Sequence, residues 1–214
     1  EAVIWTRLTS DPKRVGTEAP MPTFLYHAPG FDELQEAPPG RVRTYGRRPD
    51  DWVPIVLYDE GSSITYIEGA VIGSTGETRV LYRPAGATDW LLTDWEAVDA
   101  QRDFTHQFNL TGLVAGTEYE LRTEGRLIGD NTIGSSLDGS FRTAPPPDKP
   151  ARVVFASTTG TDYEDQDTPE GGFQIHRTML DMNVDFFVHT GDILYYDEYA
   201  KNIELARWGW ARMF

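Results

Sequence analysis

Residues 184–197, VDFFVHTGDILYYD, place an apolar run directly before a Gly-Asp step and two tyrosines. The run VDFFV is typical of a strand that is buried on both faces of a parallel sheet. A glycine then permits a sharp turn, so the polar residues lie where the strand ends. This stretch is either a plain exit from a strand, with Asp192 as a cap and the tyrosines as core residues, or part of a ligand site.

The residues before this stretch complete a β-loop-α-β unit. RVVFAS (152–157) is a second apolar strand, a polar loop follows it, and FQIHRTMLDM (173–182) has helical periodicity. The two strands should be parallel and joined by a right-handed crossover, so the loops after Ser157 and Thr190 open on one edge. Open α/β sheets bind ligands at such an edge. Residues 198–214 predict a further helix.

Oxygen-bearing side chains occur in both loops. They are Ser157, Thr158, Asp162, Glu164, Asp165 and Asp167 in the first loop, and Asp192, Tyr195, Tyr196 and Asp197 in the second. Such oxygen-rich, sulfur-free sets suit hard cations, and two cations could clamp an attack on phosphorus. Taken singly, Asp192 also fits a turn, Tyr195 fits a core residue, and the acidic run fits a solvated or calcium-binding loop.

The two histidines near these loops have different expected roles. His176 falls on the apolar face of the predicted helix, where a half-buried structural histidine is the ordinary outcome. His189 ends the second strand beside the expected crevice, so it is a candidate for substrate contact in catalysis or for support of a metal ligand.

A proline-rich junction, TAPPPDKP (143–150), separates this unit from a different kind of sequence. Before it, about seven short β-branched and aromatic runs alternate with turn signals, which predicts an all-β sandwich. The runs are AVIWTRL, WVPIVLY, SITYIEGAVIG, ETRVLYRP, DFTHQFNL, EYELRTEG and GSFRT. Tyr119, after Leu113 and Gly116, fits the tyrosine corner of fibronectin type III and immunoglobulin-like sandwiches. Residues 11–51 fit a long insertion after the first strand.

Composition limits the function classes. The chain has 214 residues, no cysteine and a formal net charge of −15. Disulfides, thiolate zinc sites and cysteine nucleophiles are therefore excluded. The negative charge predicts no nucleic-acid-binding module, and no apolar run approaches a membrane span. The sequence opens at Glu1 without a signal sequence, as expected of a processed, exported protein or of a trimmed chain.

The second half resembles the alkaline phosphatase D (PhoD-like) metallophosphoesterases, in FASTTGTDYE and in HRTMLDMNVDFFVHTGDILYYD. The resemblance implies a fibronectin III-like sandwich (1–143), a linker (144–150) and the start of an α/β, calcineurin-like metallophosphatase domain (151–214). It implies a secreted or periplasmic alkaline phosphatase or phosphodiesterase that hydrolyses phosphate mono- or diesters by metal-activated hydroxide.

The same resemblance implies a dinuclear metal centre of Fe³⁺ with Ca²⁺ or another divalent ion such as Zn²⁺, Mn²⁺ or Mg²⁺. Asp192 would be the bridging carboxylate and Tyr195 the phenolate ligand of the ferric ion. The chain departs from the family where it has Thr158 in place of a cysteine ligand, and Asp162 is the expected carboxylate substitute.

The family's remaining ligands have no counterpart in these 214 residues. We therefore expect the chain to need the remainder of a catalytic domain, on the same or a second chain, and to be inactive alone. The alternative function is a secreted fibronectin-like binding module with an inactive catalytic remnant, in which exposed Trp90 and Trp95 would contact a polymer or partner.

Overall fold

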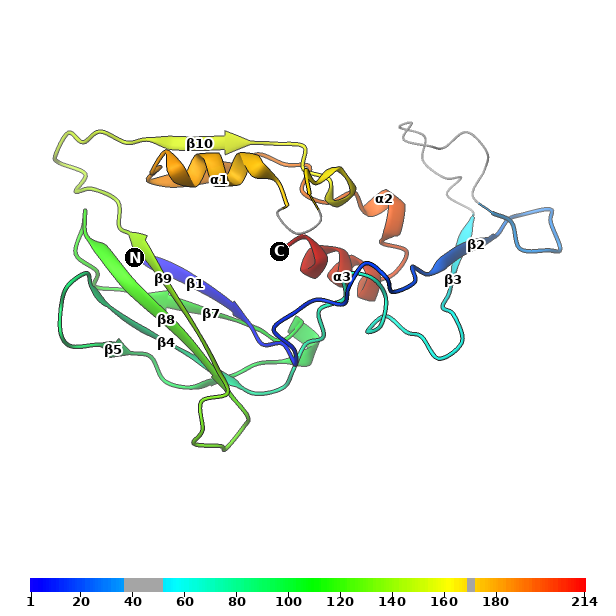
Figure 1. Ribbon diagram of the computed structural model, residues 1–214, viewed down its shortest axis with the longest axis horizontal. Helices are drawn as coiled ribbons and strands as arrows, with labels where there is room; N and C mark the ends of the chain where they lie inside the picture. Colours follow the sequence, from blue (N-terminus) through cyan, green and yellow to red (C-terminus); the bar gives the residue numbers. More distant parts are fainter. Residues whose placement is uncertain (37–51, 169–171) are drawn as a thin grey trace. The chain divides into compact units, whose positions relative to one another are not determined.

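A computed structural model of the chain describes residues 1–36, 52–168 and 172–214 (Figure 1). The protein is mostly β-structure with few helices, and it divides into two compact units. Unit 1 comprises Glu1–Ser10, Gly73–Ala156 and Met179–Val188, and unit 2 comprises Asp11–Ile72, Ser157–Thr178 and His189–Phe214. Each unit draws on both sides of the proline-rich junction, and the predicted domain boundaries at 143 and 151 stay a prediction.

Unit 1 contains two antiparallel sheets. In the smaller sheet, β1 (Ala2–Arg7) pairs with β7 (Thr105–Leu110). The larger sheet has the order β5-β4-β8-β9, with β6 also paired to β4. Its strands are β4 (Glu77–Pro84), β5 (Leu91–Leu92), β6 (Glu96–Ala97), β8 (Glu118–Arg126) and β9 (Ser135–Arg142), and the 3-10 helix η1 (Ala100–Arg102) precedes β7.

One apolar core joins these two sheets. Val80 of β4 lies fully buried against Phe108 and Leu110 of β7. Partly buried apolar side chains from both sheets surround these three, namely Ala2, Ile4, Tyr82, Leu121 and Phe141, together with Leu113. The alternation of apolar residues along β4 and β7 therefore produces two sheets that share a core, as the sequence predicted for this half.

The tyrosine corner is confirmed. The backbone N–H of Val114 donates to the hydroxyl oxygen of Tyr119 over 2.9 Å. The Tyr119 ring is buried, with 3% exposure, and it stacks on Phe141 with ring centroids 5.3 Å apart. Gly116 turns the chain between these residues at φ +65°, a conformation that favours glycine.

Trp90 and Trp95 do not form the exposed aromatic surface expected from the sequence. Both are half-buried. Arg79 and Arg126 lie over the Trp95 ring at 4.5 and 4.0 Å, and Arg83 lies over the Trp90 ring at 4.3 Å. Each of these arginines also pairs with a carboxylate on a neighbouring strand, in the pairs Arg79–Glu124, Arg126–Glu77 and Arg83–Glu120. The prediction was wrong because the arginines lie across the strands from acidic partners and cover the indoles.

Two predicted sandwich strands belong instead to unit 2. Residues 53–57 form β3 (Val53–Leu57), which pairs antiparallel with β2 (Thr23–His27) in a separate two-stranded sheet. SITYIEGAVIG (63–73) forms turns rather than a strand, with Gly69 at φ +72°. Its apolar side chains Ile67 and Ala70 are buried in the core of unit 2. The apolar pattern of this segment therefore reflected burial and not pairing in a sheet. Within the predicted insertion 11–51, β2 forms a strand, and residues 37–51 lie outside the described residues.

The core of unit 2 forms between these turns and the C-terminal helix. Ile67 and Ala70 pack with Leu205 and Trp208 of α3 (Ile203–Met213). Asn202 caps this helix by accepting from the Leu205 N–H over 2.8 Å. The shorter helix α2 (Tyr196–Tyr199) precedes it, so the predicted helical segment is confirmed with a break. No helix in 1–36, 52–168 or 172–214 has the length and apolar character needed to cross a membrane.

The β-loop-α-β order of the second half is also observed. It consists of β10 (Phe155–Thr158), the 3-10 helix η2 (Tyr163–Asp165), α1 (Gln174–Asp181) and β11 (Phe186–His189). The strands run parallel, because the bonds from Asp185 N to Val154 O and from Thr190 N to Thr158 O advance together along both. Burial on both faces was wrong for the described residues, since Phe155 is 59% exposed and Phe186 is 48% exposed.

Candidate functional site

The loops that follow β10 and β11 meet, as the sequence predicted. Backbone amides of the first loop donate to carbonyls of the second. These bonds run from Gly160 N to Gly191 O over 3.2 Å and from Thr161 N to Asp192 O over 2.9 Å. The Thr159 hydroxyl adds a donation to Gly191 O at 3.0 Å. The parallel strands therefore bring the two oxygen-rich segments to one edge of the sheet.

Asp192 has an unusual backbone conformation. Its φ is +55°, in the left-handed region, and the preceding Gly191 has φ +133°. Aspartate tolerates this region better than most residues, yet it needs surrounding contacts to hold it there. The hydrogen bond from Thr161 N to the Asp192 carbonyl supplies one such contact, and the Asp192 side chain is exposed. The Gly-Asp step thus presents a carboxylate from a fixed turn.

His189 is held at both ring nitrogens. Nε2 lies 2.9 Å from the Thr161 hydroxyl, and Nδ1 accepts the Gly191 N–H over 3.3 Å. Thr161 is buried, with 4% exposure. Sequence reasoning missed Thr161. The only signal for it was its place in the threonine-rich TTGT directly after the first strand.

The other predicted site residues have partners of their own. Asp162 caps η2 by accepting from the Glu164 N–H over 3.2 Å. Thr158 is half-buried at the end of β10, and its carbonyl accepts from the Thr190 N–H and hydroxyl over 2.9 and 3.0 Å. Thr158 therefore marks the end of the strand as expected, whereas the Asp162 carboxylate already serves the backbone.

A small cavity of about 40 Å³ lies beside these loops in unit 2. Asp162 and Tyr195 both line it, among mostly aromatic and apolar residues. The other lining residues are Tyr163, Ile193, Leu194, Tyr196, Tyr199, Ala200, Leu205, Trp208, Gly209 and Arg212. Thr158, His189 and Asp192 lie outside this lining. The structure thus brings Tyr195 and Asp162 to one cavity, with Asp192 on the adjoining turn.

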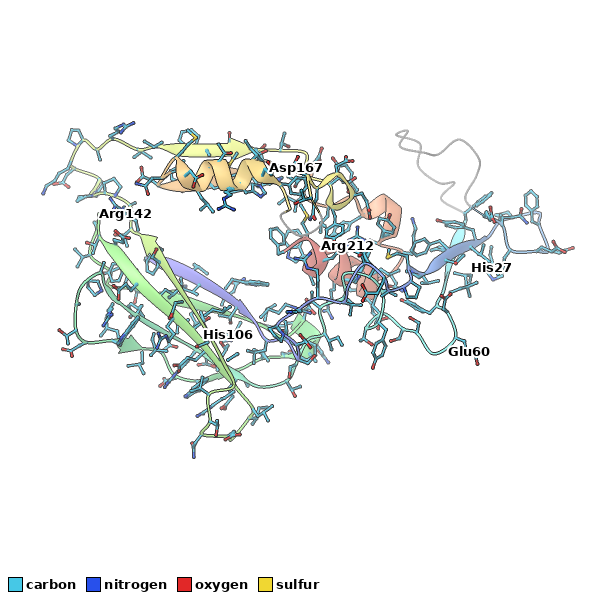
Figure 2. All side chains as sticks on the ribbon, in the orientation of Figure 1. His27, Glu60, His106, Arg142, Asp167 and Arg212 are labelled. Atoms are coloured by element: carbon cyan, nitrogen blue, oxygen red, sulfur yellow. The ribbon has the colours of Figure 1, made fainter. Side chains whose placement is uncertain are left out.

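Arg212 is the most buried charged side chain near this cavity, and no pattern in the sequence indicated its role. It lies on α3 (Figure 2), and its side chain is 3% exposed. Its guanidinium pairs with Glu68 at 3.3 Å and with Glu164. It also lies over the Tyr163 ring at 3.8 Å and the Trp208 ring at 4.6 Å. Arg212 therefore ties α3 to the loop after β10.

Tyr163 completes this cluster. Its hydroxyl donates to Glu68 over 3.2 Å. Burial, followed by the negative charge of Glu68, raises the pKa of Tyr163, while Arg14 opposes the shift. The tyrosine therefore stays protonated above the pH at which an exposed tyrosine ionises.

Three carboxylates of the acidic loop have different partners. Asp162 caps η2, Glu164 pairs with Arg212, and Asp167 accepts from the Gln174 N–H at the start of α1 over 2.8 Å. Across the described part of the chain, no group of three or more histidines, aspartates or glutamates lies close enough to hold a metal ion. The described residues thus supply oxygen donors of the kind that hard cations prefer.

No protein-family model matches this sequence, and no curated protein matches it either.

Proposed function

We propose that this chain is part of a metal-dependent phosphoesterase of the alkaline phosphatase D type, which hydrolyses phosphate mono- or diesters outside the cytoplasm. The observation that carries the proposal is the meeting of the two loops at Thr161 and Asp192. The Gly191-Asp192 step is hydrogen-bonded to the loop after β10. The resemblance implies that the family has another metal ligand at the start of that loop, at the position of Thr158. The resemblance of residues 155–164 and 176–197 supports the same assignment.

In this proposal, Asp192 and Tyr195 are metal ligands, with Thr158 and Asp162 as further candidates. The metals would be Fe³⁺ with Ca²⁺ or another divalent ion, and such ions supply hydroxide at neutral pH and neutralise phosphate charge. We expect further ligands from the remainder of the catalytic domain, since within the described residues no three histidines, aspartates or glutamates lie close enough to hold a metal ion. The exposed carboxylate of Asp192 remains open to a ligand, whereas the Asp162 carboxylate would have to leave or share its bond with Glu164 N.

The test is the Asp192→Asn variant of the intact protein, meaning this chain together with the remainder of the catalytic domain. It is assayed with a chromogenic phosphodiester after loading with iron and calcium. The change keeps side-chain volume but removes the charge that a bridging ligand needs. We expect turnover to fall by more than roughly 100-fold, which exceeds the usual loss on mutating a residue that only orients a metal ligand. Bound metal should fall with it.

The matched control is Asp181→Asn, which makes the same chemical change at an exposed position on α1. We expect it to keep full activity and metal content. An Asp192→Asn protein that remains active and replete with metal would overturn the proposal. So would an intact wild-type protein, with the remainder of its catalytic domain present, that has no phosphoesterase activity after metal loading.

A further inference from the structure

The hydrogen bonds of His189 define which ring nitrogen carries its proton. A backbone N–H can only donate, so the Gly191 N–H requires an unprotonated Nδ1 at 3.3 Å. In the neutral ring, the proton then lies on Nε2, where it is donated to the Thr161 hydroxyl oxygen at 2.9 Å. The two bonds therefore select one neutral tautomer of His189.

This tautomer is unsuited to proton transfer with a substrate. A catalytic histidine must present one ring nitrogen to the reacting group at hydrogen-bond distance. Here both ring nitrogens already have partners within the chain, and one partner, Thr161, is 4% exposed. The geometry favours support of a neighbouring group over contact with substrate.

The neighbouring group is the turn that carries Asp192. His189 Nδ1 holds the amide of Gly191, and Thr161, which holds the His189 ring, also donates its own N–H to the Asp192 carbonyl. Thr161 and His189 thus close a ring of hydrogen bonds around Gly191 and Asp192. Asp192 needs such support because its φ of +55° is unfavourable for a residue with a side chain.

We propose that His189 and Thr161 are positioning residues. Together they fix the turn that aims the Asp192 carboxylate, and His189 acts as a neutral Nε2–H donor that does not touch substrate. This inference rests on the proposed function only for the ligand role of Asp192. The ring of hydrogen bonds that joins Thr161 and His189 to Gly191 and Asp192 does not depend on that role.

The first test is spectroscopic and needs no activity. In the wild-type protein at mildly alkaline pH, the ring ¹⁵N shifts of His189 should show the neutral Nε2–H tautomer. In Thr161→Val, which removes the acceptor, that tautomer preference should weaken, and the Gly191 and Thr161 amides should exchange with solvent faster. Thr161→Ser keeps the hydroxyl and should restore both signals.

Thr159→Val is the matched control. It removes the Thr159 hydroxyl bond to Gly191 O in the same loop but leaves His189 untouched, so the tautomer should not change. A wild-type His189 that is protonated on Nδ1, or a Thr161→Val protein with unchanged tautomer and amide exchange, would overturn the proposal. If Thr161→Val fails to fold, the wild-type tautomer and Thr161→Ser decide the question.

The second test is kinetic. If His189 only positions Asp192 through Thr161, then His189→Asn and Thr161→Val should each lower kcat by roughly 10- to 100-fold with little change in KM. The kcat of the double variant should be no lower than that of the poorer single variant, because both changes break the same ring of hydrogen bonds. Additive losses, or a large loss for His189→Asn with none for Thr161→Val, would show that His189 contacts substrate.

The two tests separate the failure of this inference from that of the proposed function. Absence of phosphoesterase activity in the intact wild-type protein, with the remainder of its catalytic domain present, overturns the proposed function. The tautomer and the amide exchange rates then still decide whether His189 and Thr161 hold the turn.

Discussion

Replacing Arg212 by methionine should strongly destabilise unit 2. Methionine keeps the length and the apolar stem of the arginine but removes its charge and its donors. Glu68, whose side chain is only 13% exposed, would lose its ionic partner and keep the donation from the Tyr163 hydroxyl. Glu164 is 44% exposed, so water would replace most of what it loses.

The expected loss follows from these exposures. Removing one partner of a buried ion pair costs about 3 to 5 kcal/mol, and the remaining bond to Glu68 argues for the lower end. The exposed pair with Glu164 adds no more than about 1 kcal/mol after screening by solvent. The cation–π contact with Tyr163 at 3.8 Å adds about 1 kcal/mol, which packing of the methionine on the same ring partly restores. We expect a total of about 3 to 4 kcal/mol.

Urea unfolding, followed through the amide signals of α3, measures this loss. With m values of about 1 to 3 kcal/mol per molar urea, the midpoint should fall by about 1 to 4 M. Arg177→Met, at an exposed position on α1, is the matched control and should leave the midpoint unchanged. In double-mutant cycles, the coupling of Arg212 to Glu68 should exceed its coupling to Glu164. A loss below about 1 kcal/mol, typical of surface pairs, or the reverse order of couplings would refute this reasoning.

Two further predictions concern tyrosines. Tyr119→Phe should cost about 1 kcal/mol in the free energy of unfolding, because Val114 loses its partner but lies on the surface, whereas Tyr82→Phe should cost nothing measurable. A Tyr119→Phe protein as stable as the wild type would contradict the corner's role. Because the folded-state pKa of Tyr163 is raised above the ordinary 10.0, its contribution to stability is complete below pH 10.0 and is lost as the pH rises through the folded-state pKa. Tyr163→Phe should flatten this alkaline decline in melting experiments, and an unchanged decline would contradict the assignment.

The sequence predicted most of unit 1 because short-range patterns determine antiparallel strands and corners. One such pattern is the alternation of buried and partly buried side chains along residues 77–84, and another is the spacing of Leu113, Gly116 and Tyr119. Both depend on contacts between nearby or adjacent segments. The same patterns failed for residues 63–73. Their apolar residues pack on α3, far away in the chain, and burial there needs no strand. Periodicity reports which side chains are buried but does not identify the surface that buries them.

For the candidate site, the sequence predicted that the loops after two parallel strands would meet, since parallel strands end at the same edge. The bond from Thr161 N to Asp192 O confirms that meeting. The sequence could not predict that Asp162 would cap η2, because an aspartate before a polar turn fits a helix cap and a metal ligand equally well. The ligand roles of Asp192 and Tyr195 stay predictions.

By itself, the sequence determined the mainly β character of the protein, the helix near its end, and the turn at Gly191, because these depend on residues close together in the chain. Only the tertiary structure decided that Arg212 would be buried between Glu68 and Glu164, and that Thr161 would hold the His189 ring. These contacts join residues that are 28 or more positions apart, and no local pattern of charge or polarity encodes which distant partner a side chain meets.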